Sequence, residues 1–260
     1  MTTLTTDGVL AVAETLGVQT FPTVLVLRPR HADRQAFAAA RAAVLPELGD
    51  RGVLDRDGNV TDDLAGALFV LARPDRQLAL RIRRGGQLLR VCLARRGLDH
   101  ALAVRRGDDL EVRPVWGEED ATVLARPLLG VLGPCPPADI PVFSAPTAEL
   151  QRRLDDAGTT HASAAYQLGM SESGAIALGL ALRQCDSLAE LVCYSHRDGQ
   201  SVRSPASAAV YDTADGRIIG GGSVAADGQL WTTLAPGSDH RLAQVLAAHI
   251  EALPEGRWMP

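Results

Sequence analysis

Three Asp-Gly dipeptides divide the stretch from Leu188 to Gly237 into four apolar runs. An Asp-Gly pair between alternating hydrophobic residues is a strong hairpin signal, because glycine reaches the positive φ of a two-residue turn without strain. The stretch therefore predicts a four-stranded antiparallel meander, followed by a helix that Ser238 is placed to cap. The expected strands are Leu188–Ser195, Ala206–Thr213, Arg217–Val224 and Gln229–Leu234.

A similar pattern occurs earlier in the chain. Turn-forming residues separate four more β-rich runs, and a helical pattern over Glu118–Leu132 follows them, as Asp239–Leu253 follows the later meander. We interpret the two halves as a duplicated unit with an internal pseudo-two-fold, in which each antiparallel sheet is covered by helices on one face. The fold class is α+β (mixed α/β). The earlier strands are expected at Gln77–Arg83, Leu88–Ala94, Ala101–Arg105 and Leu110–Val115.

A proline-rich connector lies between the halves, from Gly133-Pro-Cys-Pro-Pro137 to Pro146. It is the best candidate boundary. The predicted organisation is an N-terminal half over 1–133, a connector over 134–146 and a C-terminal half over 147–260, within one compact domain. Near the N-terminus, the run Phe21–Leu27 is typical of a buried strand, since proline is tolerated where a strand starts.

Composition excludes several functions. The net charge is −5 and all 26 basic residues are arginine, so a basic nucleic-acid-binding domain is not expected. The four cysteines form no Cys-x-x-Cys pair, which argues against zinc and fits reduced thiols. The first residues have no signal-peptide pattern and no apolar run is long enough for a membrane span, so we expect a cytoplasmic protein without membrane insertion. Gly220-Gly-Gly222 lies within a strand pattern, which favours a bulge or a close approach over a phosphate site, and we expect no cofactor.

Catalytic motifs are weak. Ser171, in Gly169-Met-Ser-Glu-Ser-Gly174, lacks the glycine and the preceding strand of a nucleophile elbow, and a helix-cap role is favoured. His249 lies on the apolar face of the last helix, where a core or interface role is more common than catalysis. We therefore expect no catalytic residues; a serine hydrolase that uses Ser171 or Ser173 is the enzymatic alternative.

Binding remains. Alternation places Val192 and Tyr194 on one face of the strand Leu188–Ser195, and Tyr211 and Trp231 add aromatic side chains with polar tips. Such residues are enriched in interface cores, although they serve equally well in the core beneath helices. A sheet face with an adjacent helix surface could receive an apolar helical tip.

Several runs together resemble one family, the ESX secretion-associated EspG family. The resemblance covers nearly the whole chain. It is carried by Phe21-Pro22, Arg28-Pro29, Gly52-Val-Leu54, Leu71-Ala-Arg-Pro-Asp75, Arg95-Arg96-Gly97, His196-Arg-Asp-Gly199, Asp212–Ile218, Asp227-Gly-Gln-Leu-Trp231, Ala235-Pro-Gly-Ser238 and Leu253-Pro-Glu-Gly-Arg-Trp258.

The resemblance implies a central sheet flanked by helical bundles and a cytosolic chaperone of type VII secretion. Family members bind the apolar tip of the PPE subunit of PE–PPE heterodimers, keep it soluble and deliver the substrate. The implied partner-binding residues here are Val192, Tyr194, Tyr211, Leu230 and Trp231 on the sheet, with Ile176 and Leu180 on a helix. We expect a monomer or weak homodimer when free. A homodimeric scaffold that closes the same patch on itself is the alternative.

Overall fold

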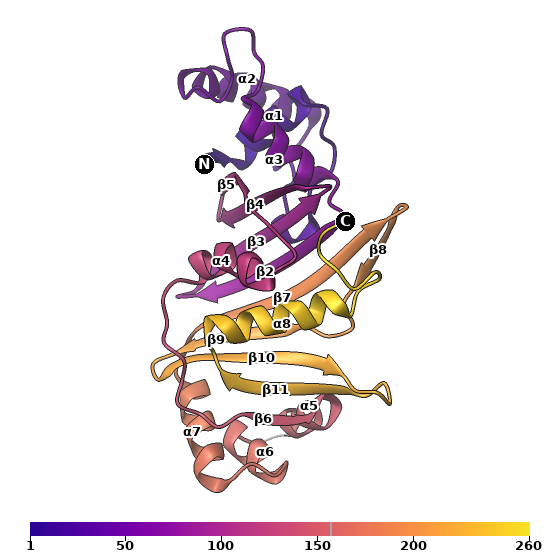
Figure 1. Ribbon diagram of the computed structural model, residues 1–260. Helices are drawn as coiled ribbons and strands as arrows, with labels where there is room; N and C mark the ends of the chain where they lie inside the picture. Colours follow the sequence, from indigo (N-terminus) through magenta and orange to yellow (C-terminus); the bar gives the residue numbers. More distant parts are fainter. Residues whose placement is uncertain (157) are drawn as a thin grey trace.

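The computed structural model describes residues 1–156 and 158–260. These residues form one sheet of 11 strands in the order β1-β5-β4-β3-β2-β7-β9-β10-β11-β6, with β8 paired to β7 (Figure 1). All its paired strands are antiparallel. The strands are β1 (Thr2–Thr5), β2 (Arg76–Arg84), β3 (Gln87–Arg96), β4 (Asp99–Arg106), β5 (Asp109–Val115), β6 (Phe143–Pro146), β7 (Cys185–Arg197), β8 (Gln200–Arg203), β9 (Ala208–Thr213), β10 (Gly216–Val224) and β11 (Leu230–Pro236).

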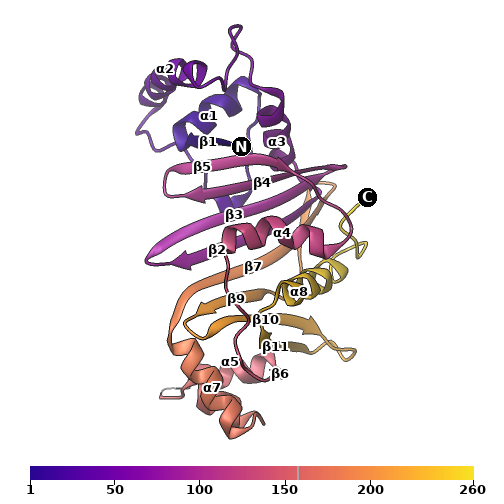
Figure 2. The same ribbon diagram turned by 60° about the vertical axis from the view of Figure 1, so that its left-hand side comes forward.

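Helices pack on both faces of this sheet (Figures 1 and 2). Helices α4 and α8 lie together over the middle of one face. On the opposite face, α1–α3 cover the β3–β5 end and α5–α7 cover the β6–β11 end. The helices are α1 (Thr6–Thr15), α2 (Arg34–Asp50), α3 (Asp62–Ala72), α4 (Ala121–Leu132), α5 (Thr147–Asp155), α6 (His161–Gln167), α7 (Glu172–Arg183) and α8 (Asp239–Glu251), with a short 3₁₀ helix η1 (Thr23–Leu25).

Three hydrophobic cores follow from this arrangement. The central one joins α4 and α8 to the sheet and contains Leu80, Leu191 and Leu246. The other two lie on the opposite face, one under α1 and α3 and one under α5–α7. Burial of each leucine side chain contributes about 2 kcal/mol to folding. Among the residues that the structure describes, no α-helix contributes to the hollow between these two outer cores, so the middle of their shared face is open.

Strands β2 and β7 join the two halves. Arg76 pairs with Ser195 and the register runs without a break to Arg84 opposite Ser187. The other edge of β7 is divided, since its first residues pair with β9 and its last with β8. The two meanders expected from the sequence are therefore confirmed, with β8 as an addition.

The hairpin turn at Asp198-Gly199 is confirmed. Both residues have positive φ, 51° for Asp198 and 75° for Gly199, and they link β7 to β8 as a two-residue loop. Positive φ at both central positions is the requirement of a type I′ turn, which asparagine, aspartate and glycine satisfy most easily.

The glycine run in β10 reflects close approach rather than phosphate binding. A Cβ on Gly221 would lie 2.7 Å from Cγ2 of Val245 in α8, and one on Gly222 would lie 2.6 Å from Cβ of Ala206. These glycines let α8 and the segment before β9 lie directly on the strand.

Two sequence-based expectations were wrong. The segment Phe21–Leu27 contains η1 (Thr23–Leu25) and no strand. Val26 takes a left-handed φ of 51°, and Nη1 of Arg105 donates to the Leu25 carbonyl at 2.7 Å. Its carbonyls are thus taken by a guanidinium and not by a neighbouring strand. The halves are also not covered on one face only. Leu102 and Ala103 project to opposite sides of β4 and both are buried, so each face needs a covering layer.

The element order is repeated across the sheet. Strand β1 pairs with β5, the last strand of the first meander, and β6 pairs with β11, the last of the second. Helices α4 and α8 follow the two meanders and pack together. A two-fold axis between the halves stays a prediction, as do the proposed boundaries of the halves and of the connector, whose range contains β6.

Within the described residues, no helix combines the length and the apolar character that crossing a membrane requires. The same residues contain no group of three or more His, Cys, Asp or Glu side chains that could hold a metal ion.

Candidate binding surface

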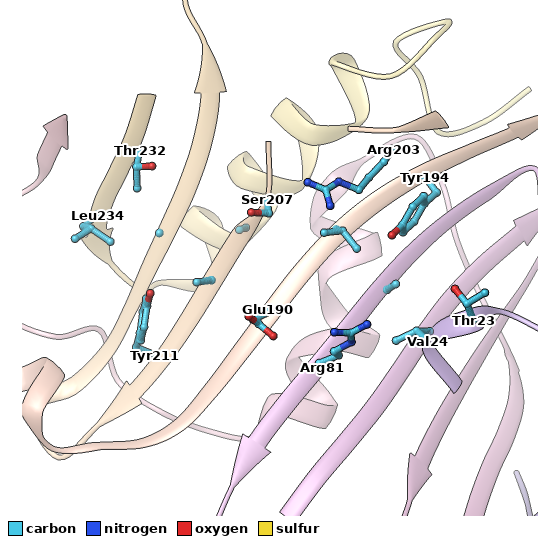
Figure 3. A pocket seen from close by; sticks show the side chains of 15 residues that line it. Thr23, Val24, Arg81, Glu190, Tyr194, Arg203, Ser207, Tyr211, Thr232 and Leu234 are labelled. Atoms are coloured by element: carbon cyan, nitrogen blue, oxygen red, sulfur yellow. The ribbon is translucent and has the colours of Figure 1, made fainter. Parts of the chain in front are cut away.

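The uncovered middle of the sheet face contains a hollow of about 430 Å³, bounded by η1 on one side and β11 on the other (Figure 3). We call it the sheet hollow. Its apolar lining consists of Val24, Ala79, Val192, Ala208, Ala209, Gly220 and Leu234, and its polar lining of Thr23, Arg81, Glu190, Tyr194, Arg203, Ser207, Tyr211 and Thr232.

Strand register explains the depth of the sheet hollow. One row of paired residues crosses the sheet from Arg81 through Glu190, Ala209 and Gly220 to Leu234. The middle of this row has almost no side chain, because alanine and glycine occupy it. Ala209 and Gly220 therefore form the low floor of the sheet hollow, between the charged Arg81 on β2 and the apolar Leu234 on β11.

Tyr194 forms a wall of the sheet hollow and also lines a second, smaller hollow of about 300 Å³ beside Phe21 and Leu71. Its ring stacks on His196, with centroids 6.1 Å apart and the planes 23° apart. His196 is itself held, since its Nε2 lies 3.2 Å from Oε1 of Gln77 and its Nδ1 lies 3.1 Å from Oγ of Ser201. Burial lowers the pKa of His196, and the nearby Arg76 lowers it further, so the ring is neutral at pH 7. Tyr194 is thus backed by a fixed, uncharged partner.

The polar groups of the sheet hollow are mostly free. Within the described residues, the side chains of Arg81, Glu190 and Arg203 make no ion pair or hydrogen bond, although Arg81 and Glu190 are directly paired across β2 and β7. The hydroxyl groups of Tyr194 and Tyr211 also make none there. Burial raises the pKa of Tyr211, with Cys185 and Glu190 adding to the effect, so its hydroxyl stays protonated and available as a donor.

Three of the seven residues expected from the sequence line the sheet hollow: Val192, Tyr194 and Tyr211. Leu230 shares the same side of β11 with Thr232 and Leu234 but lies at the start of the strand, outside the hollow. Trp231 projects to the other side of β11 by alternation, the side that α8 covers farther along the sheet.

Ile176 and Leu180 lie one turn apart on α7 and are 50% and 49% exposed. Neither lines the sheet hollow. They point away from the buried stripe of the helix, which contains Ala175, Leu178 and Ala181. The assignment of all seven residues to one partner surface stays a prediction.

Sequence reasoning missed the charged lining and the η1 side. Val24 was expected within a strand over Phe21–Leu27, and Arg81 within the strand Gln77–Arg83. Glu190 could have been predicted as a lining residue, because it lies on the same side of β7 as Val192 and Tyr194. Arg81 could not have been predicted, since its position in the sheet hollow depends on the pairing of β2 with β7, more than 100 residues away.

Ser171 and Ser204 have structural roles. Oγ of Ser171 accepts a hydrogen bond from the Gly174 backbone N–H at 3.2 Å, which confirms it as the cap of α7. Ser204 and His249 form a Ser–His contact of 3.1 Å, but both residues are buried, with His249 only 1% exposed. A substrate in solution does not reach that pair.

Fold and surface together define an α+β protein whose one large sheet offers a half-covered face with a hollow of side-chain size. A family model described as the EspG family matches residues 5–248. The chain belongs to the EspG family.

Relatives agree over nearly the full length. ESX-1 secretion-associated protein EspG1 of Mycobacterium tuberculosis is 30% identical over 262 residues, which cover 98% of this chain and 88% of the relative. ESX-3 secretion-associated protein EspG3 of Mycolicibacterium smegmatis is 31% identical over 264 residues, with coverage of 99% and 88%.

The fold also matches a solved structure, that of the Mycobacterium tuberculosis type VII secretion system chaperone EspG5 in complex with a PE25-PPE41 dimer. The TM-score is 0.79, the sequence identity is 23%, and the match covers 99% of this chain and 98% of the other. This likeness confirms the mixed helix and sheet architecture.

Proposed function

We propose that this chain is a cytosolic, non-enzymatic chaperone of a type VII (ESX) secretion system. It binds the apolar tip of the PPE subunit of a PE–PPE pair, keeps that tip soluble and delivers the pair for secretion. Family membership supports the secretion role, and the complex in which EspG5 was solved supports the class of partner.

The observation that carries the proposal is the sheet hollow. It is open to solvent, and its floor of Ala209 and Gly220 leaves room for side chains of another protein. Val192 and Leu234 offer apolar contact there, as a chaperone for an apolar tip needs. The helical groups α1–α3 and α5–α7 lie at either end of this face, with the sheet hollow between them (Figures 1 and 2).

A non-enzymatic role is supported by the two serine sites. The Ser171 hydroxyl is committed to its helix cap, and the Ser204–His249 pair is enclosed. A hydrolase would need a nucleophile and a base together at an accessible surface.

The test is co-expression of the tagged chain with each PE–PPE pair encoded by its own genome, followed by light scattering on the purified material. We expect one or more pairs to form a complex with one copy of each of the three chains, and the chain alone to be a monomer or weak homodimer. A folded chain that binds no pair and instead forms a tight dimer would contradict the proposal and favour a self-associating scaffold.

A further inference from the structure

We propose that the sheet hollow recognises an acidic side chain of its protein partner, held by Arg81 and Arg203, next to an apolar side chain packed on the floor. This inference rests on the proposed function and deepens it, because it names the residues that select among partners. It is carried by the distribution of charge and of hydrogen-bond donors around the sheet hollow.

The two arginines come from different strands and both line the sheet hollow. Arg81 lies on β2 next to Val24, and Arg203 lies at the end of β8, opposite Tyr194 in the strand pairing (Figure 3). Along β7, Val192 lies between Glu190, which pairs with Arg81, and Tyr194, which pairs with Arg203. A group that enters over Val192 therefore meets a guanidinium group from each side.

Arg81 stands out among the arginines of its row. Arg105, Arg90 and Arg81 are directly paired across β4, β3 and β2, and like charges in such positions destabilise a sheet. Arg105 donates to the Leu25 carbonyl at 2.7 Å and Arg90 donates to the Val24 carbonyl at 3.3 Å. Among the residues that the structure describes, Arg81 has no such acceptor. The guanidinium N–H groups of Arg81 can therefore donate hydrogen bonds to a ligand.

Glu190 does not neutralise this set. It is paired with Arg81 in the register, yet the described residues show no ion pair between them. Two guanidinium groups against one carboxylate leave the lining with an excess positive charge and many N–H donors. The complement is an anion with several acceptor atoms, and a carboxylate matches the planar fork of arginine.

The apolar lining identifies the anion as part of a protein. Val192, which is only partly buried, would stay in contact with water beneath a free phosphate or another small anion, and the buried side chains of Val24 and Leu234 border it in the sheet hollow. A chain segment with an apolar residue beside an aspartate or glutamate covers them and meets the arginines as well. An interface of this kind gains selectivity and association rate from the charge pair.

The experiment measures the affinity of a PE–PPE pair, one that co-purifies with the wild-type chain, at two salt concentrations. We expect Arg81→Glu and Arg203→Glu each to weaken binding about tenfold or more at low salt. The wild-type affinity falls with added salt, and the Arg81→Glu/Arg203→Glu double variant loses most of that dependence. Melting temperatures check the fold, and Arg81→Gln serves as a second variant without charge reversal.

Two variants serve as controls. Arg106→Glu makes the same charge change on an exposed residue that does not line the sheet hollow, and it should leave the affinity nearly unchanged. Glu190→Gln removes a carboxylate that repels an acidic partner, and it should therefore raise the affinity. Reversal of each acidic residue at the partner tip to arginine should identify one that restores binding to Arg81→Glu.

The possible failures differ. A wild-type chain that binds no PE–PPE pair overturns the proposed function, and this inference with it. A wild-type chain that binds, with Arg81→Glu and Arg203→Glu binding equally well, overturns this inference alone. Weakening by Glu190→Gln as large as by Arg81→Gln also overturns it, because recognition would then not depend on the sign of the charge.

Discussion

The indole nitrogen of Trp258 donates a hydrogen bond to Nε2 of His100 at 2.9 Å, between residues 158 positions apart. Nδ1 of His100 lies 3.0 Å from the Leu98 carbonyl. Since an indole N–H is only a donor, Nε2 must accept and Nδ1 must carry the proton, so His100 is neutral. Burial lowers its pKa, in agreement with this form.

This bond belongs to a strap, Pro254–Met259, that follows α8 and returns to the first half of the chain. The buried Arg76 donates to the Arg257 carbonyl at 3.1 Å and to the Pro254 carbonyl at 3.0 Å. The Glu119 carboxylate accepts the backbone N–H of Trp258 at 3.1 Å and that of Met259 at 2.7 Å. The strap thus fixes the C-terminal half onto β2, β4 and the start of α4.

Trp258→Ala tests the strap. Trp258 is fully buried, so the change leaves a cavity and removes the His100 bond, and we expect the free energy of unfolding to fall by about 3–5 kcal/mol. Urea denaturation measures it. Trp116→Ala is the matched control, because that ring is 75% exposed and its loss should cost less than about 1 kcal/mol. Equal effects of the two changes would show that the strap does not stabilise the fold.

His249 should make stability depend on pH. Burial lowers its pKa to about 4 from 6.5. The unfolded chain therefore takes up a proton below about pH 6.5 that the folded chain takes up only near pH 4. Stability from this residue is present above pH 6.5 and is lost as the pH falls through that window, by roughly 3 kcal/mol.

Denaturation curves of His249→Leu and wild type between pH 7 and pH 4 measure that contribution. The variant should show a shallower loss of stability with acid. His240→Gln, an exposed histidine at the start of the same helix, should keep the wild-type slope. Parallel curves for His249→Leu and wild type would mean that His249 is not the titrating group.

The two glycine positions Gly221 and Gly66 should respond in opposite directions to alanine. At Gly221 the new Cβ meets Val245 at 2.7 Å, and we expect a loss of about 1–3 kcal/mol. At Gly66, in α3, nothing lies within 4 Å, so alanine should stabilise the helix by about 0.5–1 kcal/mol. Thermal melts compare the stability of the two variants. Adding Val245→Ala to Gly221→Ala should recover part of the lost stability. An unchanged stability of Gly221→Ala would show that α8 does not lie as close to β10 as described.

Ile176 and Leu180 separate two versions of the partner surface. Both are half-exposed, so the double change to aspartate should alter the free energy of unfolding by less than about 1 kcal/mol. If α7 belongs to the surface, as we expect from the family resemblance, the same change weakens binding of the PE–PPE pair about tenfold or more. Titration calorimetry decides, and unchanged binding would confine the surface to the sheet.

Much of the fold was predictable because its signals are local. The Asp198-Gly199 turn, the caps at Ser171 and Ser238 and the alternation in both meanders each depend on a few neighbouring residues. The same alternation placed Val192 and Tyr194 on one face of β7, and both line the sheet hollow.

The remainder depends on partners distant in the sequence. Leu25 and Val26 were expected in a strand, but the Arg105 side chain takes their carbonyls from another element. Arg81 lines the sheet hollow only because β2 pairs with β7. No local pattern shows which strands pair, so the place of Arg81 in the lining could not be predicted from the sequence, whereas that of Glu190 follows from alternation along β7.

The central claim is that the sheet hollow receives the partner. The most direct test is calorimetric titration of one PE–PPE pair into the wild-type chain and into Ala209→Trp, which fills the floor of the hollow from within. Leu98→Trp, at an exposed turn, is the control for adding an indole ring. We predict that Ala209→Trp abolishes binding while Leu98→Trp and the melting temperatures stay as in the wild type. Wild-type affinity in Ala209→Trp would contradict the account.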